Sequence, residues 1–580
     1  MTPTLTLLIV GGYGTFGGRI VELLEHDPRL VILVAGRSWE KAHRYCSARI
    51  AATARLVAAA FDRDGDLIRQ LEILQPGILI DASGPFQAYG KRPYALIEAC
   101  IARGIHYLDL ADGSDFVAGV SAFNKDAVAR GISVLSGASS FPVLTAAAVR
   151  RLSSGMHRVD SITGGIAPSP YAHVGRNVIR AIAGYAGRRV SLKRDGRPAF
   201  GYPFTEQIRF TIAPPGHVPL KSTMFSLVDV PDLKALADLW PEAKSVWMGA
   251  GPVPALLHRS LIALAWLARL RFVPSLSPLV PVIHFAANHL VWGEHRGGMF
   301  VEVKGTARTG EPLIRSWHLL AEGDDGPLIP SMAVAAIIRK TLGGQPPVAG
   351  ARDASRDLEL DDYEPLFASR RIVTGLRDDV PRSAPLQKRL LGAAWDRLPK
   401  AIRAMHDVTE GHFARGRADV DRGTGVLAHA VATVLGFPKA GRDLPVTVRF
   451  ERVNESEIWT RDFAGRSFSS TQFEGIGRAA QLLCEKFGPI TFRMALVVQS
   501  NRVHLIPRGW SLLGIPLPGW LSPRAAAYET VEDGRFRFHV EISLPWGGLI
   551  VRYRGWLMRS DEEESVPLSV APETEEAIAG

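Results

Sequence analysis

The stretch GGYGTFGG (Gly11–Gly18) follows the apolar run TLTLLIV at positions 4–10. A short apolar run of this kind predicts a buried strand. The residues that follow, from 15 to 27, repeat apolar side chains at helical spacing and predict an amphipathic helix. The glycines therefore lie where a strand turns directly into a helix, and this junction decides how the rest of the first 150 residues is interpreted.

The same alternation continues beyond the junction. Apolar strand-like runs are separated by segments with helical spacing, and continuous apolar strands joined by helices predict a parallel sheet covered on both faces. The six runs are TLTLLIV (4–10), LVILVA (30–35), RLVAAAF (55–61), GILIDAS (77–83), IHYLDLAD (105–112) and ISVLSG (132–137).

Within the junction, three glycines have the spacing of a dinucleotide-binding turn. Gly12 suits the tight turn, Gly14 leaves room for a pyrophosphate, and Gly17 lets helix and strand pack closely. Free N–H groups and the helix dipole at the start of the helix favour phosphate charge. The predicted phosphate-binding residues are Gly12, Tyr13, Gly14, Thr15, Phe16 and Gly17.

The end of the second strand bears on which dinucleotide is bound. It reads VAGRS, so Arg37 and Ser38 stand where NAD-specific folds place an acidic residue for the ribose 2′-OH. A guanidinium pairs with a 2′-phosphate and a hydroxyl donates to it, which favours NADP over NAD. In the alternative interpretation, Arg37 only ends the strand in solvent.

Two further loops are expected to contact the dinucleotide. Asp62, after the third strand, is placed for the adenine side, or alternatively caps the next helix. After the fourth strand, small residues and a proline predict a loop that approaches the nicotinamide half. This loop is Ser83, Gly84, Pro85 and Phe86; the alternative is an ordinary connection with no ligand.

Candidate catalytic groups follow the fifth strand. Tyr107, Asp109 and Asp112 lie toward its carboxyl end, where open α/β sheets bind their ligands. A carboxylate desolvated there has a pKa suited to proton transfer. The competing interpretation is that the two aspartates accept hydrogen bonds from turn N–H groups. We interpret His106 as a packed strand residue.

These motifs together resemble the saccharopine dehydrogenase-like family of NAD(P)-dependent oxidoreductases, across about residues 1–380. The similar segments are GGYGTFG, AGR, SGPF, HYLDLADG, SGASSFP, GGIAPSP (164–170) and GPLIPSMAVAAIIRKTLGG (326–344). The resemblance implies a dinucleotide domain, a second α+β domain, an active site between them and hydride exchange at a carbon–nitrogen bond.

The sequence also departs from this family. Ser139 stands where relatives commonly have an aspartate, and a serine supplies no charge for a substrate ammonium. No paired arginines that suit a dicarboxylate amino acid are evident in the middle region. We therefore expect the substrate to differ from saccharopine. His173 and Arg176 either reach the cleft or lie on a solvated helix face.

Composition limits the remaining classes of function. The chain has 580 residues, 47% hydrophobic and 22% charged, which predicts several ordered domains. Its three cysteines lack metal-ligand spacing, so neither a disulfide framework nor a metal site is expected. The net charge of +10 is scattered without a nucleic-acid motif, and the N-terminus has no signal-peptide pattern. A cytoplasmic protein is expected.

Residues 253–292 form an unusually apolar segment. Arginines and prolines interrupt it, which excludes a spanning helix of about 20 apolar residues. The segment is amphipathic, so it either closes the second domain or a homodimer interface, or contacts the inner surface of a membrane. We favour the buried interface, because apolar helical stripes most often belong to a core.

The last third of the chain changes character. Residues 346–390 are rich in charge and proline and predict a linker, whereas 391–560 alternate with period two and predict an antiparallel β-rich domain. WTRDFAGRSF and SLPWGGLIVRYRG resemble a domain of unknown function found with the same family. The acidic tail 561–580 is expected to be disordered.

The predicted fold class is α/β: a Rossmann-type parallel sheet (1–150), a mixed α+β domain (151–345), the linker and the β-rich domain. The predicted function is an NADP-dependent oxidoreductase acting on a small carbonyl, imine or amine compound. Two alternatives stay open, a non-catalytic NADP-binding adaptor and a peripheral-membrane enzyme with a lipid-like substrate.

Overall fold

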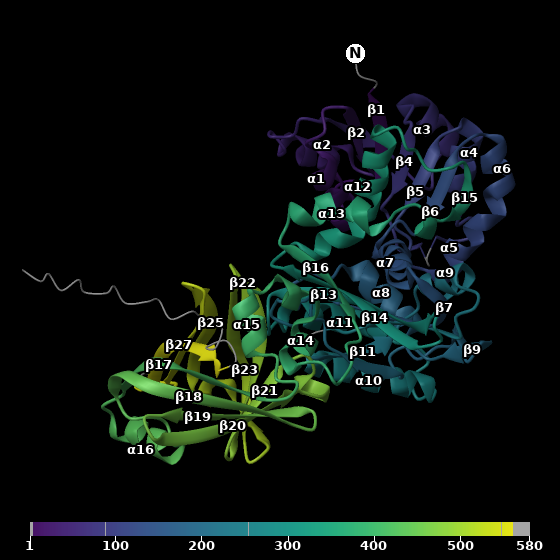
Figure 1. The fold of residues 1–580 in the computed structure, drawn as a ribbon. Coiled ribbons are helices and arrows are strands. Elements are labelled where there is room, and N and C mark those ends of the chain that lie inside the picture. The colour runs from purple at the N-terminus through teal and green to yellow at the C-terminus, as the bar shows by residue number, and fades with distance from the viewer. Residues whose placement is uncertain (1–3, 87–88, 253, 547, 561–580) are drawn as a thin grey trace, which may run out of the picture. The chain divides into compact units, whose positions relative to one another are not determined.

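The computed structural model describes residues 4–86, 89–252, 254–546 and 548–560. The chain divides into two compact units (Figure 1). The first contains residues up to 214 and 220–379, and the second contains residues 215–219 and the chain from Val380 onward. The predicted acidic tail at 561–580 lies outside the described residues.

The first unit begins with a parallel sheet in the order β15-β6-β5-β4-β1-β2-β3. Every pairing in it is parallel, as the apolar runs predict. Its strands are β1 (Leu5–Val10), β2 (Leu30–Gly36), β3 (Arg55–Ala60), β4 (Ile78–Asp81), β5 (His106–Asp109), β6 (Ser133–Ser136) and β15 (Gly350–Asp353).

Helices cover both faces of this sheet. Leu7 and Ile9 of β1 point into one apolar cluster with α1 and α12, and Leu8 and Val10 point into another with α3 and α4. This is why β1 carries apolar residues on both faces, with Thr6 as its one polar residue, rather than alternating. The helices are α1 (Thr15–Leu24), α2 (Trp39–Ser47), α3 (Leu67–Leu74), α4 (Ala95–Arg103), α5 (Ser114–Gly119), α6 (Asn124–Ala129), α12 (Ile329–Leu342) and α13 (Leu360–Ala368).

A second, mixed sheet completes the first unit, in the order β10-β11-β12-β7-β13-β14-β16. β12 runs parallel to β7, and the other pairings are antiparallel. The strands are β7 (Met156–Ala167), β10 (Gln207–Phe210), β11 (Thr223–Leu227), β12 (Ser245–Ala250), β13 (Arg296–Ala307), β14 (Pro312–Glu322) and β16 (Ile372–Asp378). The helices are α7 (Thr145–Ser153), α8 (Arg176–Tyr185), α9 (Asp232–Leu239), α10 (Ala255–Arg269) and α11 (Val280–His289), beside the hairpin β8 (Val190–Arg194) and β9 (Arg197–Gly201).

The prediction of a linker at 346–390 is wrong. Within it, β15 pairs with β6 of the parallel sheet, and β16 pairs with β14 of the mixed sheet. Between them, α13 packs on α12. The sequence does not indicate these short elements, because the segment is rich in charge and proline and has no local periodicity. Their pairing partners also lie far away in the sequence.

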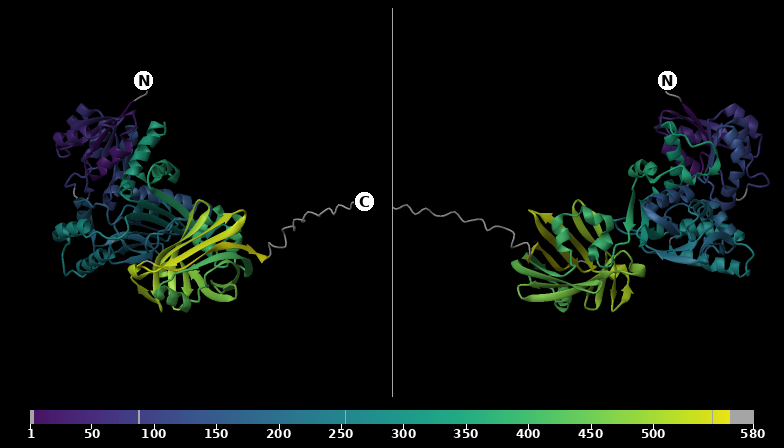
Figure 2. Two further views of the ribbon diagram at one scale, coloured as in Figure 1. Left: turned by 90° about the vertical axis from the view of Figure 1, so that its left-hand side faces the viewer. Right: turned by 45° about the vertical axis from the view of Figure 1, so that its right-hand side comes forward.

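The second unit is dominated by an antiparallel sheet that closes on itself. Its strands follow the order β22-β21-β20-β19-β18-β17-β27-β26-β25-β23, and β22 also pairs with β23. Figure 2 shows the strong curvature of this sheet. The strands are β17 (His412–Arg422), β18 (Gly441–Val453), β19 (Ser456–Phe463), β20 (Arg466–Glu474), β21 (Leu483–Phe487), β22 (Ile490–Gln499), β23 (Arg502–Leu512), β24 (Ile515–Leu517), β25 (Arg524–Glu532), β26 (Arg535–Ser543) and β27 (Leu549–Arg559).

Among the described residues, three α-helices accompany the closed sheet: α14 (Leu386–Leu391), α15 (Lys400–Met405) and α16 (Val426–Val434). α15 packs against β25 and β26, and α16 packs against β27. The predicted fold class is confirmed for each part: a parallel Rossmann-type sheet, a mixed second sheet and a β-rich C-terminal domain.

Candidate functional site

The glycine turn after β1 is held by backbone contacts alone. The N–H groups of Gly11 and Gly12 both donate to the carbonyl of Ala35, over 2.9 and 3.0 Å, and Gly14 donates to Gly11 over 2.8 Å. A Cβ at Gly12 would lie 2.9 Å from the carbonyl oxygen of Ile9, and one at Gly17 would overlap that of Gly11. The turn therefore excludes side chains at both positions, as the motif predicts.

The start of α1 leaves backbone donors available. Gly14 is the N-cap and has no side chain with which to cap the helix, and the first turn carries no acidic residue. Among the described residues, none accepts a hydrogen bond from the N–H groups of Tyr13, Thr15, Phe16 or Gly17. Such donors, with the helix dipole, suit a phosphate group. The turn thus fits the pyrophosphate of a dinucleotide.

At the end of β2, Arg37 extends into solvent and Ser38 begins α2. Arg37 has no hydrogen-bond or ion-pair partner among the described residues. The Ser38 hydroxyl accepts from Lys41 N over 3.2 Å and donates to Glu40 over 2.8 Å. Tyr13 reaches across this edge, and its hydroxyl accepts from Ser38 N over 3.3 Å. Sequence reasoning missed Glu40, a carboxylate that stands beside the predicted 2′-phosphate position.

Asp62 is exposed at the end of β3 and forms a local turn. Its carboxylate accepts from Asp64 N over 3.1 Å. The Gln70 side chain accepts from the Asp62 N–H and donates to the Asp62 carbonyl. The N-cap of α3 is Asp66, which accepts from Arg69 N. The alternative interpretation of Asp62 as a helix cap is therefore wrong, and its contact with an adenine stays a prediction.

The loop after β4 is shaped by the buried carboxylate of Asp81. It accepts from Ser83 N over 3.0 Å and from the Ser83 hydroxyl over 2.5 Å, and Tyr89 donates to it over 3.2 Å. Phe86 is buried against Phe116, with ring centroids 5.2 Å apart. Gly84 and Pro85 are thereby presented between two anchored residues, next to the glycine turn.

Two of the three candidate catalytic side chains are buried. Tyr107 is 1% exposed in the apolar cluster under α4, and burial raises its pKa well above the usual value. Asp109 is fully buried and accepts from Gly137 N over 2.7 Å, Ala111 N over 2.9 Å and the Ser136 hydroxyl. Asp109 joins the loops after β5 and β6, and Tyr107 is packed in an apolar core. We therefore assign both residues a structural role rather than a catalytic one.

Asp112 is exposed at the carboxyl edge and belongs to a group of carboxylates from both sheets' connections. Asp229, before α9, accepts from the Ser114 hydroxyl over 2.5 Å. Burial raises the pKa of Asp229, and the charges of Asp115 and Asp112 raise it further. Asp229 is a candidate acid that no signal in the sequence indicates, because it lies 115 residues beyond its partner Ser114.

The second domain also reaches the loops that surround the glycine turn. Asn177, at the start of α8, donates to the Gly84 carbonyl over 3.3 Å, and a Cβ on Gly175 would lie 3.9 Å from the Thr15 hydroxyl. His173 and Arg176 lie in the same segment, and both are exposed. The His173 ring lies 6.1 Å from that of His284. The start of α8 therefore stands over the predicted phosphate and nicotinamide loops.

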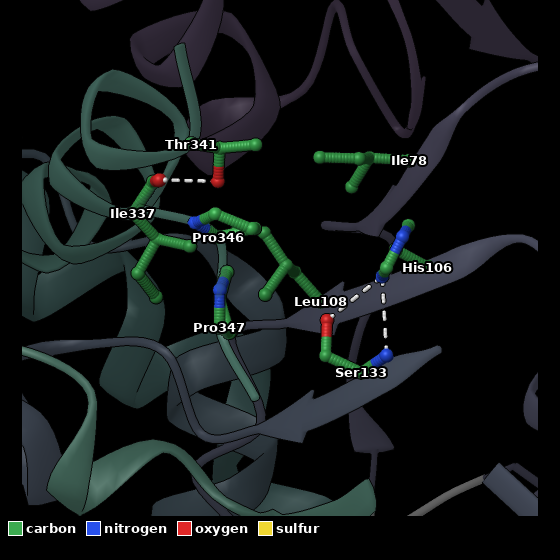
Figure 3. Close-up of a pocket in the computed structure, with 8 residues that line it drawn as sticks. All are labelled: Ile78, His106, Leu108, Ser133, Ile337, Thr341, Pro346 and Pro347. Carbon is green, nitrogen blue, oxygen red and sulfur yellow. Dashed lines mark hydrogen bonds between the residues drawn. The ribbon is translucent and has the colours of Figure 1, made fainter. Parts of the chain in front are cut away.

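A small hollow lies at the opposite, amino edge of the parallel sheet (Figure 3). It is lined by His106, Ser133 and residues of α12 and the segment after it. His106 Nδ1 accepts from Ser133 N over 3.1 Å, and burial lowers the pKa of His106. His106 is thus a packed strand residue, as predicted, and this hollow is separate from the carboxyl edge.

Groups of three or more His, Cys, Asp or Glu side chains that suit a metal ion are absent from the described residues. Within the same residues, no helix has the length and apolar character needed to cross a membrane.

Comparison with known families agrees with this architecture. Residues 7–135 match the saccharopine dehydrogenase NADP binding domain, and residues 398–557 match a domain of unknown function, DUF4166. Both resemblances found in the sequence are thereby confirmed. No curated protein matches the chain.

Several solved structures are similar to part of the chain. Saccharopine dehydrogenase (L-Glu forming) from Saccharomyces cerevisiae is 11% identical, with a TM-score of 0.46, covering 65% of this chain and all of that one. A meso-dapdh mutant from Clostridium tetani is 14% identical (TM-score 0.31, 62% and 97% covered). The WlbA dehydrogenase from Thermus thermophilus, in complex with NAD and UDP-GlcNAcA, is 12% identical (TM-score 0.27, 59% and 89% covered).

Proposed function

We propose that this chain, an oxidoreductase whose first domain is of the saccharopine dehydrogenase nicotinamide-binding type, uses NADP to oxidise or reduce a small carbonyl, imine or amine compound. The observation that carries the proposal is the glycine turn, where the N–H groups of Tyr13, Thr15, Phe16 and Gly17 have no acceptor among the described residues. When bound, the nicotinamide supplies or accepts the hydride.

Each loop of the carboxyl edge has a role in this proposal. The N–H groups of Tyr13, Thr15, Phe16 and Gly17 hold the pyrophosphate, and the Arg37 guanidinium pairs with the 2′-phosphate. The Ser83–Phe86 loop, fixed by Asp81 and by Asn177, supports the nicotinamide half. Asp62 stands on the adenine side.

We assign the proton transfer to the carboxylates of Asp112 and Asp229. Burial and the neighbouring aspartates raise the pKa of Asp229 above that of an exposed carboxyl, which suits a group that donates a proton to a substrate nitrogen or oxygen. The negative charge of the neighbouring aspartates attracts a cationic nitrogen. An imine or amine compound is therefore favoured over a carboxylate-rich substrate. In this proposal, Asp229 of the second domain supplies the negative charge that Ser139 lacks.

Titration of the full-length chain with NADPH and NADH tests the cofactor. We expect NADPH to bind more tightly and Arg37→Ala to lose at least tenfold in NADPH affinity with NADH affinity unchanged. Glu40→Gln is the matched control, because it alters the neighbouring charge without touching the guanidinium and should not weaken NADPH binding. Equal loss for both coenzymes on Arg37→Ala would contradict the role of Arg37.

Incubation with a metabolite extract separates an enzyme from an adaptor. We expect NADPH oxidation or NADP reduction that Asp229→Asn slows at least tenfold, while NADPH affinity stays the same. A chain that binds NADPH and stays silent with broad extracts would instead act as a non-catalytic NADP-binding adaptor.

A second proposal concerns the outer face of α10 and α11. The two helices pack on the core through Ala265 and Val280, whereas Val282 of α11 (65%) and Phe272 of the connection between the helices (75%) are exposed. Further exposed apolar side chains of α10, α11 and their flanking residues are Leu256, Trp266, Leu267, Leu270, Phe285, Leu290 and Trp292. Exposed apolar patches on this scale mark interaction surfaces.

Charge favours a membrane as the partner of this face. Residues 243–293 contain no Asp or Glu, whereas Arg259 and Arg271 are exposed among the apolar residues. Aromatic and aliphatic side chains flanked by arginine suit an anionic lipid surface. We therefore propose peripheral attachment to a membrane, with a homodimer as the competing occupant.

Cosedimentation with vesicles decides between these occupants. We expect the full-length chain to bind vesicles that contain anionic lipid and to be released by the double substitution Phe272→Asp and Phe285→Asp. Failure to bind vesicles, together with a dimer that the same double variant dissociates in sedimentation equilibrium, would contradict membrane attachment.

A further inference from the structure

The closed sheet of the second unit encloses a cavity. It has room for water-sized molecules over about 110 Å3, and its walls come from β18 to β23, β25 to β27 and α15. Core packing normally leaves few voids larger than a water molecule. A single buried water needs only about 10–15 Å3 of such space, and closed sheets of eight or more strands are wide enough to hold a ligand. The size of this space therefore fits a binding cavity rather than a packing defect.

Most of the wall is apolar or aromatic. Phe450, Trp459, Phe492, Met494 and Tyr553 are among the lining residues. Inward-facing positions alternate along the strands, since Val446, Val448 and Phe450 of β18 all line the space while the residues between them do not. An occupant of matching chemistry has a large apolar body.

Besides Glu529 and His539, which also line the space, a hydrogen-bonded polar group is built into this wall from three neighbouring strands. Arg461 Nη2 donates to Glu485 Oε1 over 3.1 Å, and Arg461 Nη1 donates to Ser470 over 2.8 Å. The same carboxylate oxygen accepts from the Ser470 hydroxyl over 2.7 Å and from Gln472 Nε2 over 3.1 Å. Arginine and glutamate neutralise each other, so the group presents no net charge to an occupant.

Gln472 has an unused acceptor. Its side chain is 2% exposed and lines the cavity, yet its amide oxygen has no hydrogen-bond partner among the described residues. Glu485 accepts from the amide nitrogen, which fixes the orientation of the amide and leaves the oxygen for another donor. A buried acceptor without a partner costs stability, and a ligand hydroxyl would satisfy it.

We propose that the closed sheet binds a neutral lipid alcohol: a long-chain or polycyclic apolar molecule whose hydroxyl donates to Gln472 Oε1. The apolar wall takes the body of the molecule. The neutral Arg461–Glu485 pair gives no advantage to a carboxylate, and a hydrocarbon without a donor leaves the amide oxygen unpaired. This site is separate from the carboxyl edge of the parallel sheet and stands whether or not the nicotinamide proposal holds.

A fluorescent long-chain alcohol tests this site on the full-length chain after extraction with organic solvent. Three probes of one chain length are compared: the alcohol, its methyl ether and the matching fatty acid. We expect the alcohol to bind more tightly than both. Gln472→Leu should weaken alcohol binding about tenfold, the value of one buried hydrogen bond, and leave ether binding unchanged.

Two further variants control the experiment. Gln499→Leu makes the same substitution at an exposed position of β22 and should change nothing. Ala527→Phe adds volume inside the cavity and should weaken alcohol and ether alike. Thermal unfolding identifies a variant that fails to fold, in which case the other two variants decide.

Three results would overturn the proposal. They are no binding of the alcohol to the wild type, tighter binding of the fatty acid than of the alcohol, and equal losses for alcohol and ether on Gln472→Leu.

Discussion

The glycine turn of the first unit and the cavity of the second are sites of opposite construction. At the turn, Gly12 and Gly17 leave no room for a side chain, and the proposed ligand contacts are backbone N–H groups. In the closed sheet, the backbone groups pair with each other and side chains shape the space. A backbone site depends on a few glycines at fixed spacing, whereas a side-chain site depends on many residues that each tolerate exchange.

The largest expected effect tests the backbone site. Gly17→Ala should weaken NADPH binding at least a hundredfold, because its Cβ would overlap the Gly11 carbonyl and force the turn open. Isothermal titration measures the loss. Gly184→Ala is the control: it lies in α8 with open space around its Cβ and should bind NADPH normally. Normal binding by Gly17→Ala would show that the turn does not depend on its glycines.

The next effect concerns the buried carboxylate that ties the loops beside the turn. Burial raises the pKa of Asp109 to about 7, so the folded chain holds a proton that the unfolded chain releases near pH 4. Stability should therefore fall as the pH rises from about 4 to 7, by up to about 4 kcal/mol from this group.

Asp109→Asn should remove this part of the pH dependence. It should also cost about 2 kcal/mol at pH 5, because the amide cannot accept from all three donors. Denaturant unfolding at several pH values measures both.

Asp232, whose burial raises its pKa to about 8, is a matched site. Asp232→Asn should flatten the pH dependence of the unfolding free energy up to pH 8. A wild-type stability that rises between pH 4 and 7 would contradict the assignment.

A conservative exchange in the cavity should have a smaller effect. Met494→Leu keeps the volume of the wall nearly constant, and such exchanges usually cost less than about 1.5 kcal/mol. We expect alcohol-probe affinity to change less than fivefold, with NADPH affinity unchanged. A loss as large as that of Gly17→Ala would mean that both sites depend on single residues, which would remove the contrast between them.

The smallest expected effect is at Ser38. Its hydroxyl accepts from Lys41 N as the cap of α2 and donates to Glu40, so its first role is local. Ser38→Ala should cost about 1 kcal/mol of stability and weaken NADPH binding less than threefold. A tenfold loss of NADPH affinity, with NADH affinity and stability unchanged, would instead indicate that Ser38 contacts the 2′-phosphate directly.

The same contrast explains what the sequence could predict. The six apolar runs and the glycine spacing are local signals, and they predicted the parallel sheet and its turn. The strand Gly350–Asp353 has only four residues and pairs with β6 across more than 200 positions, so no local pattern marks it. Asp109 was predicted at the right edge, but its burial against Ser136 and Gly137 depends on how two loops meet.

The remaining site residues depend on tertiary structure. Asp229 and Asn177 come from the second domain, and their partners Ser114 and Gly84 are 115 and 93 residues away. For the closed sheet, alternation predicted strands but did not indicate which face encloses space. Gln472 was therefore one polar residue among many until its amide oxygen was found buried and unpaired.

Hydrogen–deuterium exchange at the backbone amides of residues 11–18, with and without saturating NADPH, tests the central claim most directly. The account predicts selective slowing of exchange at Tyr13, Thr15, Phe16 and Gly17, with no change in the strands of the closed sheet. Unchanged exchange at these four amides under saturating NADPH would contradict it.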